Sequence, residues 1–187
     1  MGLISKIKIK AGNYFLNREV IRHRKVEASN WQSAKSIGII YRIDDERSFK
    51  HIRWYIKELK KRYGSKRIFA LGYSDEKNAP AYLSHGLEFD YFIKKDLNWY
   101  GKPRSKSSDS FTSEQFDMLI DFTDGSCVPL RFVLFSSRAT FKIGRYAKNN
   151  EEIYDLLISL EDDSWNHFME QLDKYCLLYT SPSPRDS

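Results

Sequence analysis

The sequence predicts an α/β protein, a Rossmann-like three-layer sandwich with a mostly parallel sheet. Two patterns in the 187 residues support this prediction. Short apolar segments alternate with segments of helical spacing, which is the order found in β-α-β units. The apolar segments also lack the alternation of a half-exposed strand, as expected of strands that are covered on both faces.

Six segments are expected to be strands, and three are expected to be helices. The strands are 36–41, 67–73, 89–93, 117–122, 140–143 and 154–159, and the helices are 49–63, 128–135 and 163–175. In the first helix, Phe49 and Ile52 begin an apolar series at spacings of three and four, and Gly64 follows as a stop signal. Residues 101–110 have the composition of a loop.

Positive charge is concentrated at the N-terminus. Residues 1–25 contain seven cations and one anion, so they account for the whole net charge of +6. We expect residues 1–30 to form a basic helix appended to a domain of residues 31–175. The candidate contacts on this helix are Lys6, Lys10, Arg18 and Arg22. Residues 4–25 could contact an anionic membrane surface or a nucleic acid; the alternative is a helix that packs one side and solvates its cations.

The remaining composition predicts a soluble, cytoplasmic protein. Hydrophobic residues make up 41% of the chain, which argues against disorder. There is no transmembrane segment, because no run of eighteen apolar residues occurs, and the N-terminus lacks the features of a secretory signal. Two cysteines provide no disulfide framework and suit a reducing compartment.

The last twelve residues, 176–187, resemble a translated transposase-type sequencing adapter over their full length. A segment of helical spacing breaks there into a Ser-Pro-Ser-Pro run without a cap. The alternative is a natural disordered tail. We expect the native domain to end at residue 175, and we assign no function to the residues after it.

Acidic side chains are expected at the carboxyl ends of the strands, where open α/β sheets bind ligands. Asp44 and Asp45 follow the first strand, and Asp121 and Asp124 lie at the fourth. With nearby hydroxyls they could hold a hard cation such as Mg²⁺. The alternative, which we favour, is that Asp44, Asp45 and Asp124 cap the helices that follow. No metal site and no cofactor are therefore predicted.

Other catalytic patterns are missing from the sequence. No phosphate-binding glycine motif follows any expected strand, and the first turn is acidic, so the usual modes of nucleotide binding are not expected. Cys127 and the four scattered histidines form no nucleophile–base or metal-binding signature. A lone cysteine at the start of an apolar helix is more often a small buried residue. The sequence therefore favours a protein that is not an enzyme.

The most distinctive polar and aromatic string runs from Asp96 to Pro103. Within it, four residues are candidate surface contacts, because loops carry binding residues. These residues are Asn98, Trp99, Tyr100 and Lys102. The alternative is a tight turn that Trp99 and Tyr100 anchor on the edge of the sheet.

Two resemblances add to this interpretation. The strings 71–73, 94–103, 121–124 and 141–146 resemble an uncharacterised bacterial family carried under a domain-of-unknown-function label, across nearly all of residues 1–175. More faintly, residues 116–122 and 129–144 are similar to part of the N-terminal half of heptosyltransferase-like glycosyltransferases. That resemblance implies a Rossmann-like half-domain. The glycine-containing acceptor loop is replaced here by 42–46, and the half that binds the nucleotide sugar is absent.

Three hypotheses on function follow. The first is a non-enzymatic intracellular interaction or scaffold domain that binds an unknown protein partner through the basic helix and residues 98–102. The second is a degenerate or partner-dependent glycosyltransferase-like enzyme with a cleft around Asp44, Asp121 and Asp124. The third is a membrane-surface or nucleic-acid adaptor that acts through residues 4–25.

Overall fold

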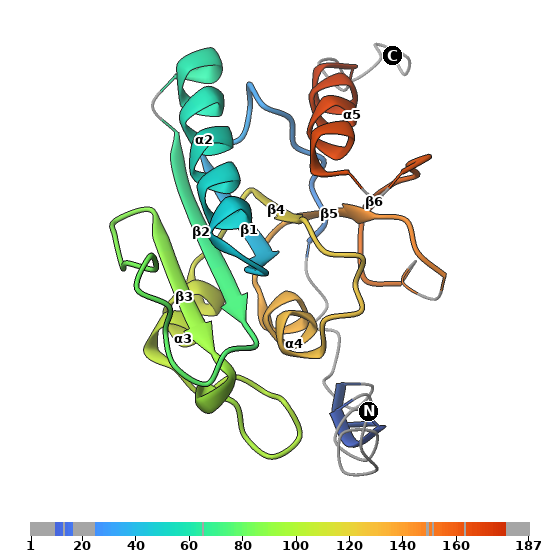
Figure 1. The fold of residues 1–187 in the computed structure, drawn as a ribbon. Helices are drawn as coiled ribbons and strands as arrows, with labels where there is room; N and C mark the ends of the chain where they lie inside the picture. The colour runs from blue at the N-terminus through green and yellow to red at the C-terminus, as the bar shows by residue number, and fades with distance from the viewer. Residues whose placement is uncertain are drawn as a thin grey trace.

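The protein is built around one parallel sheet of six strands (Figure 1). The computed structural model describes residues 10–12, 14–16, 25–64, 66–148, 150, 152–162 and 164–178. The strand order is β3-β2-β1-β4-β5-β6. The strands are β1 (Ser36–Arg42), β2 (Arg67–Ser74), β3 (Phe89–Ile93), β4 (Met118–Asp121), β5 (Phe141–Arg145) and β6 (Leu156–Ile158). The predicted α/β class and parallel sheet are confirmed.

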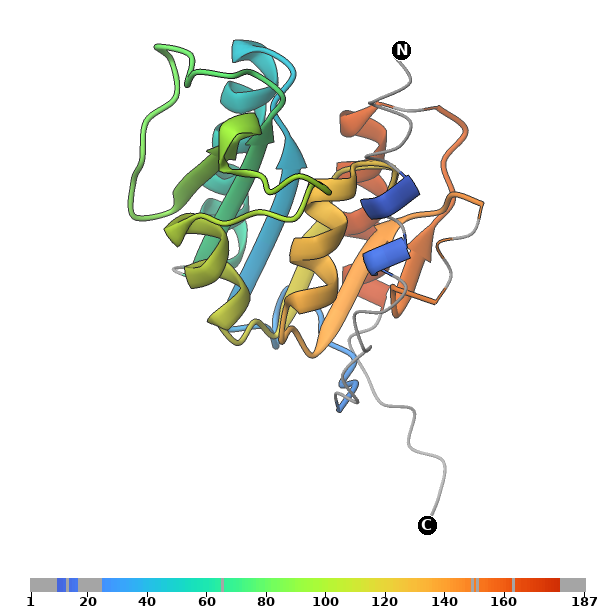
Figure 2. The same ribbon diagram turned by 90° about the horizontal axis from the view of Figure 1, so that it is seen from below.

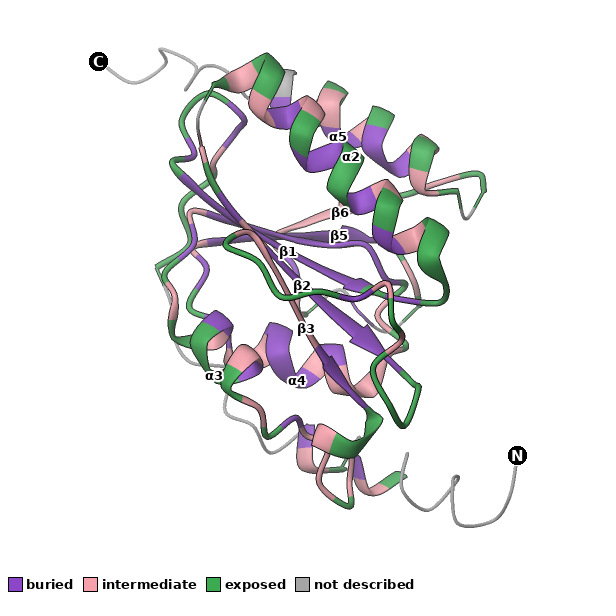
Figure 3. Ribbon diagram, turned by 60° about the vertical axis from the view of Figure 1, so that its left-hand side comes forward, coloured by how far each residue is buried: buried purple, intermediate pink, exposed green. Residues whose placement is uncertain are grey.

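Helices cover both faces of the sheet. Seen from below (Figure 2), α3 (Lys106–Ser113) and α4 (Val128–Ser136) lie in front of the strands. Figure 3 shows α2 (Glu46–Tyr63) and α5 (Trp165–Leu178) on the opposite face. A short 3-10 helix, η1 (Lys94–Asp96), follows β3. Each face has its own buried apolar cluster, so the predicted three-layer sandwich is confirmed.

The helix α2 begins where the sequence provides both partners of a capping box. The carboxylate of Asp45 accepts a hydrogen bond from the backbone N–H of Ser48 at 2.8 Å, and Oγ of Ser48 accepts one from the backbone N–H of Asp45 at 3.2 Å. The helix ends before Gly64, which has a φ of +80° that favours glycine. It starts at Glu46, three residues before the predicted segment, because polar capping residues determine its start.

The expected loop of residues 101–110 contains the beginning of a helix, which is a correction to the sequence prediction. Oγ of Ser105 accepts a hydrogen bond from the backbone N–H of Ser108 at 3.1 Å and caps α3. Ser108 and Phe111 are buried. Serines are common in loops as well as in helix caps, and one apolar side chain in eight residues gives no helical periodicity. For this reason, no helix was predicted over residues 106–113.

The two ends of the chain depart from the predicted boundaries. The basic helix predicted over residues 1–30 lies mostly outside the described residues; residues 10–12 and 14–16 are helical, whereas residues 25–30 are not. At the other end, α5 extends to Leu178 and includes the buried Cys176. Within the described part of the chain, no helix is both long and apolar enough to cross a membrane.

Candidate functional site

The carboxyl ends of β1 and β4 are neighbours at the point where the strand order reverses. Asp121, the last residue of β4, is fully buried there. One of its oxygens accepts a hydrogen bond from the backbone N–H of Thr123, and the other accepts one from the hydroxyl of Tyr154, both at 2.7 Å. Burial raises the pKa of Asp121 and the pKa of Tyr154. Both oxygens of this carboxyl group are therefore engaged in holding the fold together.

Gly144 on β5 makes room for this arrangement. A Cβ atom at this position would collide with the ring of Tyr154. The ring therefore lies directly against the strand, where its hydroxyl reaches Asp121. This contact gives a structural reason for the glycine in the string 141–146.

The other three strand-end acids do not converge on one site. Asp45 caps α2, and Asp44 forms an ion pair with Nε of Arg42 at 2.8 Å. Oδ1 of Asp124 accepts a hydrogen bond from the backbone N–H of Ser126 at 2.9 Å. Burial opposes ionisation of Asp124, but hydrogen bonds from Ser126 hold its pKa below the ordinary value. The predicted capping role is confirmed for Asp45; the side chains of Asp44 and Asp124 do not cap a helix.

Cys127 is the N-cap residue of α4 and makes no side-chain capping hydrogen bond. Burial raises the pKa of its thiol to about 12. Because the thiolate is the nucleophilic form, the side chain is a weak nucleophile at neutral pH. Among the residues that the structure describes, no three His, Cys, Asp or Glu side chains are placed to hold a metal ion together.

The string from Asp96 to Pro103 forms a turn that Asn98 closes. Oδ1 of Asn98 accepts hydrogen bonds from the backbone N–H groups of Tyr100 at 3.1 Å and Lys102 at 2.9 Å. At the base of the turn, Leu97 and Pro103 form an isolated antiparallel bridge. Asn98 therefore shapes the turn with its side chain, whereas the tight-turn alternative expected Trp99 and Tyr100 to anchor it.

The described N-terminal residues pack against this turn. The ring of Phe15 lies with its centroid 5.9 Å from that of Trp99 and 4.4 Å from that of Tyr100. Gly12 approaches so closely that a Cβ atom would come within 2.7 Å of the carbonyl oxygen of Tyr100 and 2.8 Å of Val128 in α4. Figures 1 and 2 both place this segment beside α4. The structure thus brings together the two segments that the sequence proposed as separate contact surfaces.

This packing leaves two aromatic side chains largely exposed. Trp99 is 62% exposed and Tyr14 is 56% exposed, and Lys10, which precedes Tyr14 by four residues, is exposed as well. The ammonium group of Lys102 lies 5.8 Å from the ring centroid of Phe132 in α4. We call Lys10, Tyr14, Trp99 and Lys102 the aromatic–basic surface. The other candidate cations, Lys6, Arg18 and Arg22, lie outside the described residues.

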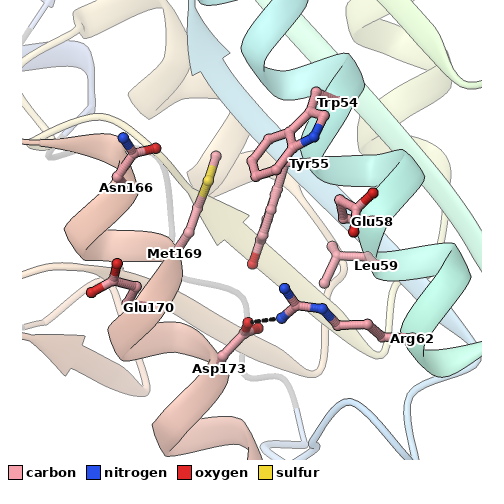
Figure 4. A pocket seen from close by; sticks show the side chains of 9 residues that line it. All are labelled: Trp54, Tyr55, Glu58, Leu59, Arg62, Asn166, Met169, Glu170 and Asp173. Atoms are coloured by element: carbon pink, nitrogen blue, oxygen red, sulfur yellow. Dashed lines mark hydrogen bonds and ion pairs between the residues drawn. The ribbon is translucent and has the colours of Figure 1, made fainter.

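A groove of about 370 Å³ between α2 and α5 contains polar groups that the sequence did not single out (Figure 4). Tyr55 and Arg62 extend into it from α2, and Asp173 extends into it from α5. More than a hundred residues separate the two helices in the sequence, and each of these side chains resembles an ordinary member of an amphipathic helix. No local signal could have joined them.

Comparison with known proteins places most of the chain in one family. A family of unknown function (DUF6913) matches residues 8–177, which include β1 to β6, α2 to α4, all but the last residue of α5, and both segments that meet at the turn. No curated protein and no solved structure matches the chain. The resemblance to glycosyltransferases remains a prediction from the sequence. The chain belongs to DUF6913, a family of unknown function.

Proposed function

We propose that the protein is a non-enzymatic interaction domain that binds an anionic membrane surface through its aromatic–basic surface. The observation that carries this proposal is the packing of the N-terminal segment on the turn, which leaves Tyr14 and Trp99 exposed on segments that also contain Lys10 and Lys102. Tyrosine and tryptophan are the side chains that lie at the headgroup level of bilayers. Lysines next to them attract anionic lipids.

The distribution of charge supports an anionic partner. Residues 94–106, which contain the turn, have five cations and one anion. This segment and residues 1–25 carry net charges of +4 and +6, so the rest of the chain has a net charge of −4. Each lysine or arginine near an anionic bilayer contributes about 1 kcal/mol of attraction. The opposite net charges would orient the domain with its aromatic–basic surface toward the lipid.

The strand-end residues support a binding role over a catalytic one. Asp45, Asp121 and Asp124 each accept hydrogen bonds that hold a helix start or a loop in place. Both cysteines are free thiols, in keeping with a reducing compartment. We place the protein at the cytoplasmic face of a bacterial membrane, which is the location that fits these thiols and the anionic leaflet.

Vesicle sedimentation with the full chain tests this proposal. We expect binding to vesicles of phosphatidylcholine and phosphatidylglycerol, little binding to phosphatidylcholine alone, and loss of binding at high salt. Trp99→Ala should weaken binding about tenfold. The control is Leu87→Ala in the β2–β3 connection, since Leu87 is 93% exposed and lies outside the aromatic–basic surface.

Three results would overturn the membrane assignment. The first is equal binding to neutral and anionic vesicles, and the second is full binding by Trp99→Ala. The third is binding to duplex DNA, to RNA or to a co-purifying acidic protein with no binding to anionic vesicles. In that case the same surface would serve a different anionic partner.

A further inference from the structure

The groove between α2 and α5 lies on the sheet face opposite α3 and α4 (Figure 3). Its volume of about 370 Å³ is within the range of small-molecule sites. Leu59 and Met169 give it an apolar lining, and Trp54, which is 51% exposed, lines it from α2. The groove therefore has the size and the partly apolar character of a site for one small organic molecule.

Tyr55 places a polar group in this groove that the fold does not use. The residue is 4% exposed, and its hydroxyl has no hydrogen-bond partner among the described residues. Figure 4 shows the side chain pointing between the two helices, with the hydroxyl toward Arg62 and Asp173. Burial, and then the nearby Asp173 carboxylate, raise the pKa of Tyr55, so the hydroxyl stays protonated and can both donate and accept. A ligand that bonded to it would satisfy a buried group that is otherwise unpaired.

Asp173 is partly committed to other contacts. One of its oxygens pairs with the guanidinium of Arg62, yet burial still raises the pKa of its carboxyl group. Its other oxygen and the indole N–H of Trp31 are both buried without a hydrogen-bond partner in the described part of the chain. The indole N–H of Trp31 lies close enough to lower the pKa of the Asp173 carboxyl group, so a small movement would complete a hydrogen bond between these two groups. We therefore assign the buried ligand contact to Tyr55.

The charges around the groove favour a cation. Glu58 from α2 and Glu170 from α5 line it, and neither forms an ion pair with a described residue. Of the described residues that line the groove, Arg62 alone is cationic, and Asp173 neutralises it. The exposed indole of Trp54 adds a face that attracts an ammonium group.

From these observations we infer that the groove binds a small organic cation, a primary ammonium group on an apolar body. The ammonium group donates a hydrogen bond to the Tyr55 hydroxyl and is attracted by Glu58 and Glu170. The apolar body packs against Leu59 and Met169. This site is separate from the aromatic–basic surface and does not depend on the proposed membrane function.

Calorimetry and NMR titration of the full chain test this site with two matched probes. We expect 2-phenylethylamine to bind at least about tenfold more tightly than the uncharged 2-phenylethanol. Tyr55→Phe keeps the ring and removes only the unpaired hydroxyl, so it should weaken amine binding about fivefold without lowering the unfolding temperature. The double variant Glu58→Gln/Glu170→Gln should weaken it about tenfold. The control is Glu161→Gln, an exposed residue outside the groove.

The inference fails if the alcohol binds as tightly as the amine. It also fails if Tyr55→Phe lowers the unfolding temperature and leaves the affinity unchanged, because the hydroxyl would then be structural. If Tyr55→Phe does not fold, the double variant Glu58→Gln/Glu170→Gln is the test, because its changes lie at the surface of the groove. Unchanged affinity of this variant for the amine would overturn the inference. A lysine-containing peptide is the third probe; tighter binding of this peptide than of the free amine would contradict a small-molecule site.

Discussion

The carboxyl edge of the sheet and the aromatic–basic surface lie next to each other, but their side chains are used differently. At the sheet edge, the polar groups point inward and are paired, as the two hydrogen bonds to Asp121 show. On the aromatic–basic surface, the backbone of the turn is held by Asn98 while the rings of Tyr14 and Trp99 remain exposed. This difference indicates that the polar side chains at the edge where α/β proteins often bind ligands stabilise the fold here. The neighbouring surface is the one for which we propose a partner.

The largest expected effect concerns the reactivity of Cys127 at the sheet edge. Because burial raises the pKa of its thiol from 9.0 to about 12, we expect its thiolate fraction to fall about a thousandfold. A disulfide reagent should therefore modify Cys127 far more slowly in the native protein than in urea. Cys176, whose pKa burial also raises to about 12, should behave in the same way. Rapid native labelling of Cys127 would restore the hypothesis of a reactive cysteine at this edge.

The next effect is on stability. Tyr154→Phe removes the donor to one oxygen of Asp121 and leaves that oxygen buried without its partner. We expect the free energy of unfolding to fall by about 2 kcal/mol, the scale of a buried hydrogen bond to a charged group. Urea unfolding followed by circular dichroism measures this loss. A change below about 0.5 kcal/mol would mean that this pair does not hold the sheet edge together.

The two ends of β4 should show opposite dependence on pH. The pKa of Asp121 is raised in the fold, so its contribution to stability is present at low pH and is lost as pH rises above the ordinary value of 3.8. Asp117, just before β4, accepts hydrogen bonds from the backbone N–H groups of Lys35 and Ser36. Burial opposes ionisation there, but these bonds lower its pKa, so its contribution is present above 3.8 and is lost on acidification.

Urea unfolding of Asp121→Asn and Asp117→Asn at a series of pH values measures these signs. The advantage of the natural protein over Asp121→Asn should shrink as pH rises from the ordinary carboxyl pKa toward neutrality. Its advantage over Asp117→Asn should instead be nearly complete above that pKa and should shrink as pH falls below it. The same sign in both variants would contradict the assignment of a structural, buried role to Asp121.

A smaller effect is expected where the two regions meet. Gly12→Val introduces a side chain against the carbonyl of Tyr100 and against Val128. We expect a stability loss of about 1 kcal/mol from this overpacking, together with weaker vesicle binding because the N-terminal segment is displaced from the turn. Urea unfolding and vesicle sedimentation measure the two changes. Unchanged vesicle binding would show that the two segments act independently.

The sheet could be predicted from the sequence because its strands contain short apolar segments, such as residues 37–41 in β1 and 118–120 in β4. The helix α3 could not, since its signal is a pair of serines, Ser105 and Ser108, in a stretch with the composition of a loop. For the turn, the residues were predicted but their roles were left open: the Asn98 side chain accepts hydrogen bonds from the backbone N–H groups of Tyr100 and Lys102, whereas Trp99 faces solvent. Local patterns identify elements and caps, but they do not show which side chains the tertiary structure leaves unpaired.

The most direct test of the membrane proposal is to measure vesicle binding and unfolding of Trp99→Ala together. Because Trp99 is largely exposed, we expect its free energy of unfolding to stay within about 0.5 kcal/mol of that of the natural chain. Its binding to anionic vesicles should nevertheless weaken about tenfold. Undiminished vesicle binding by this stable variant would contradict the claim that the aromatic–basic surface is where the protein meets its partner.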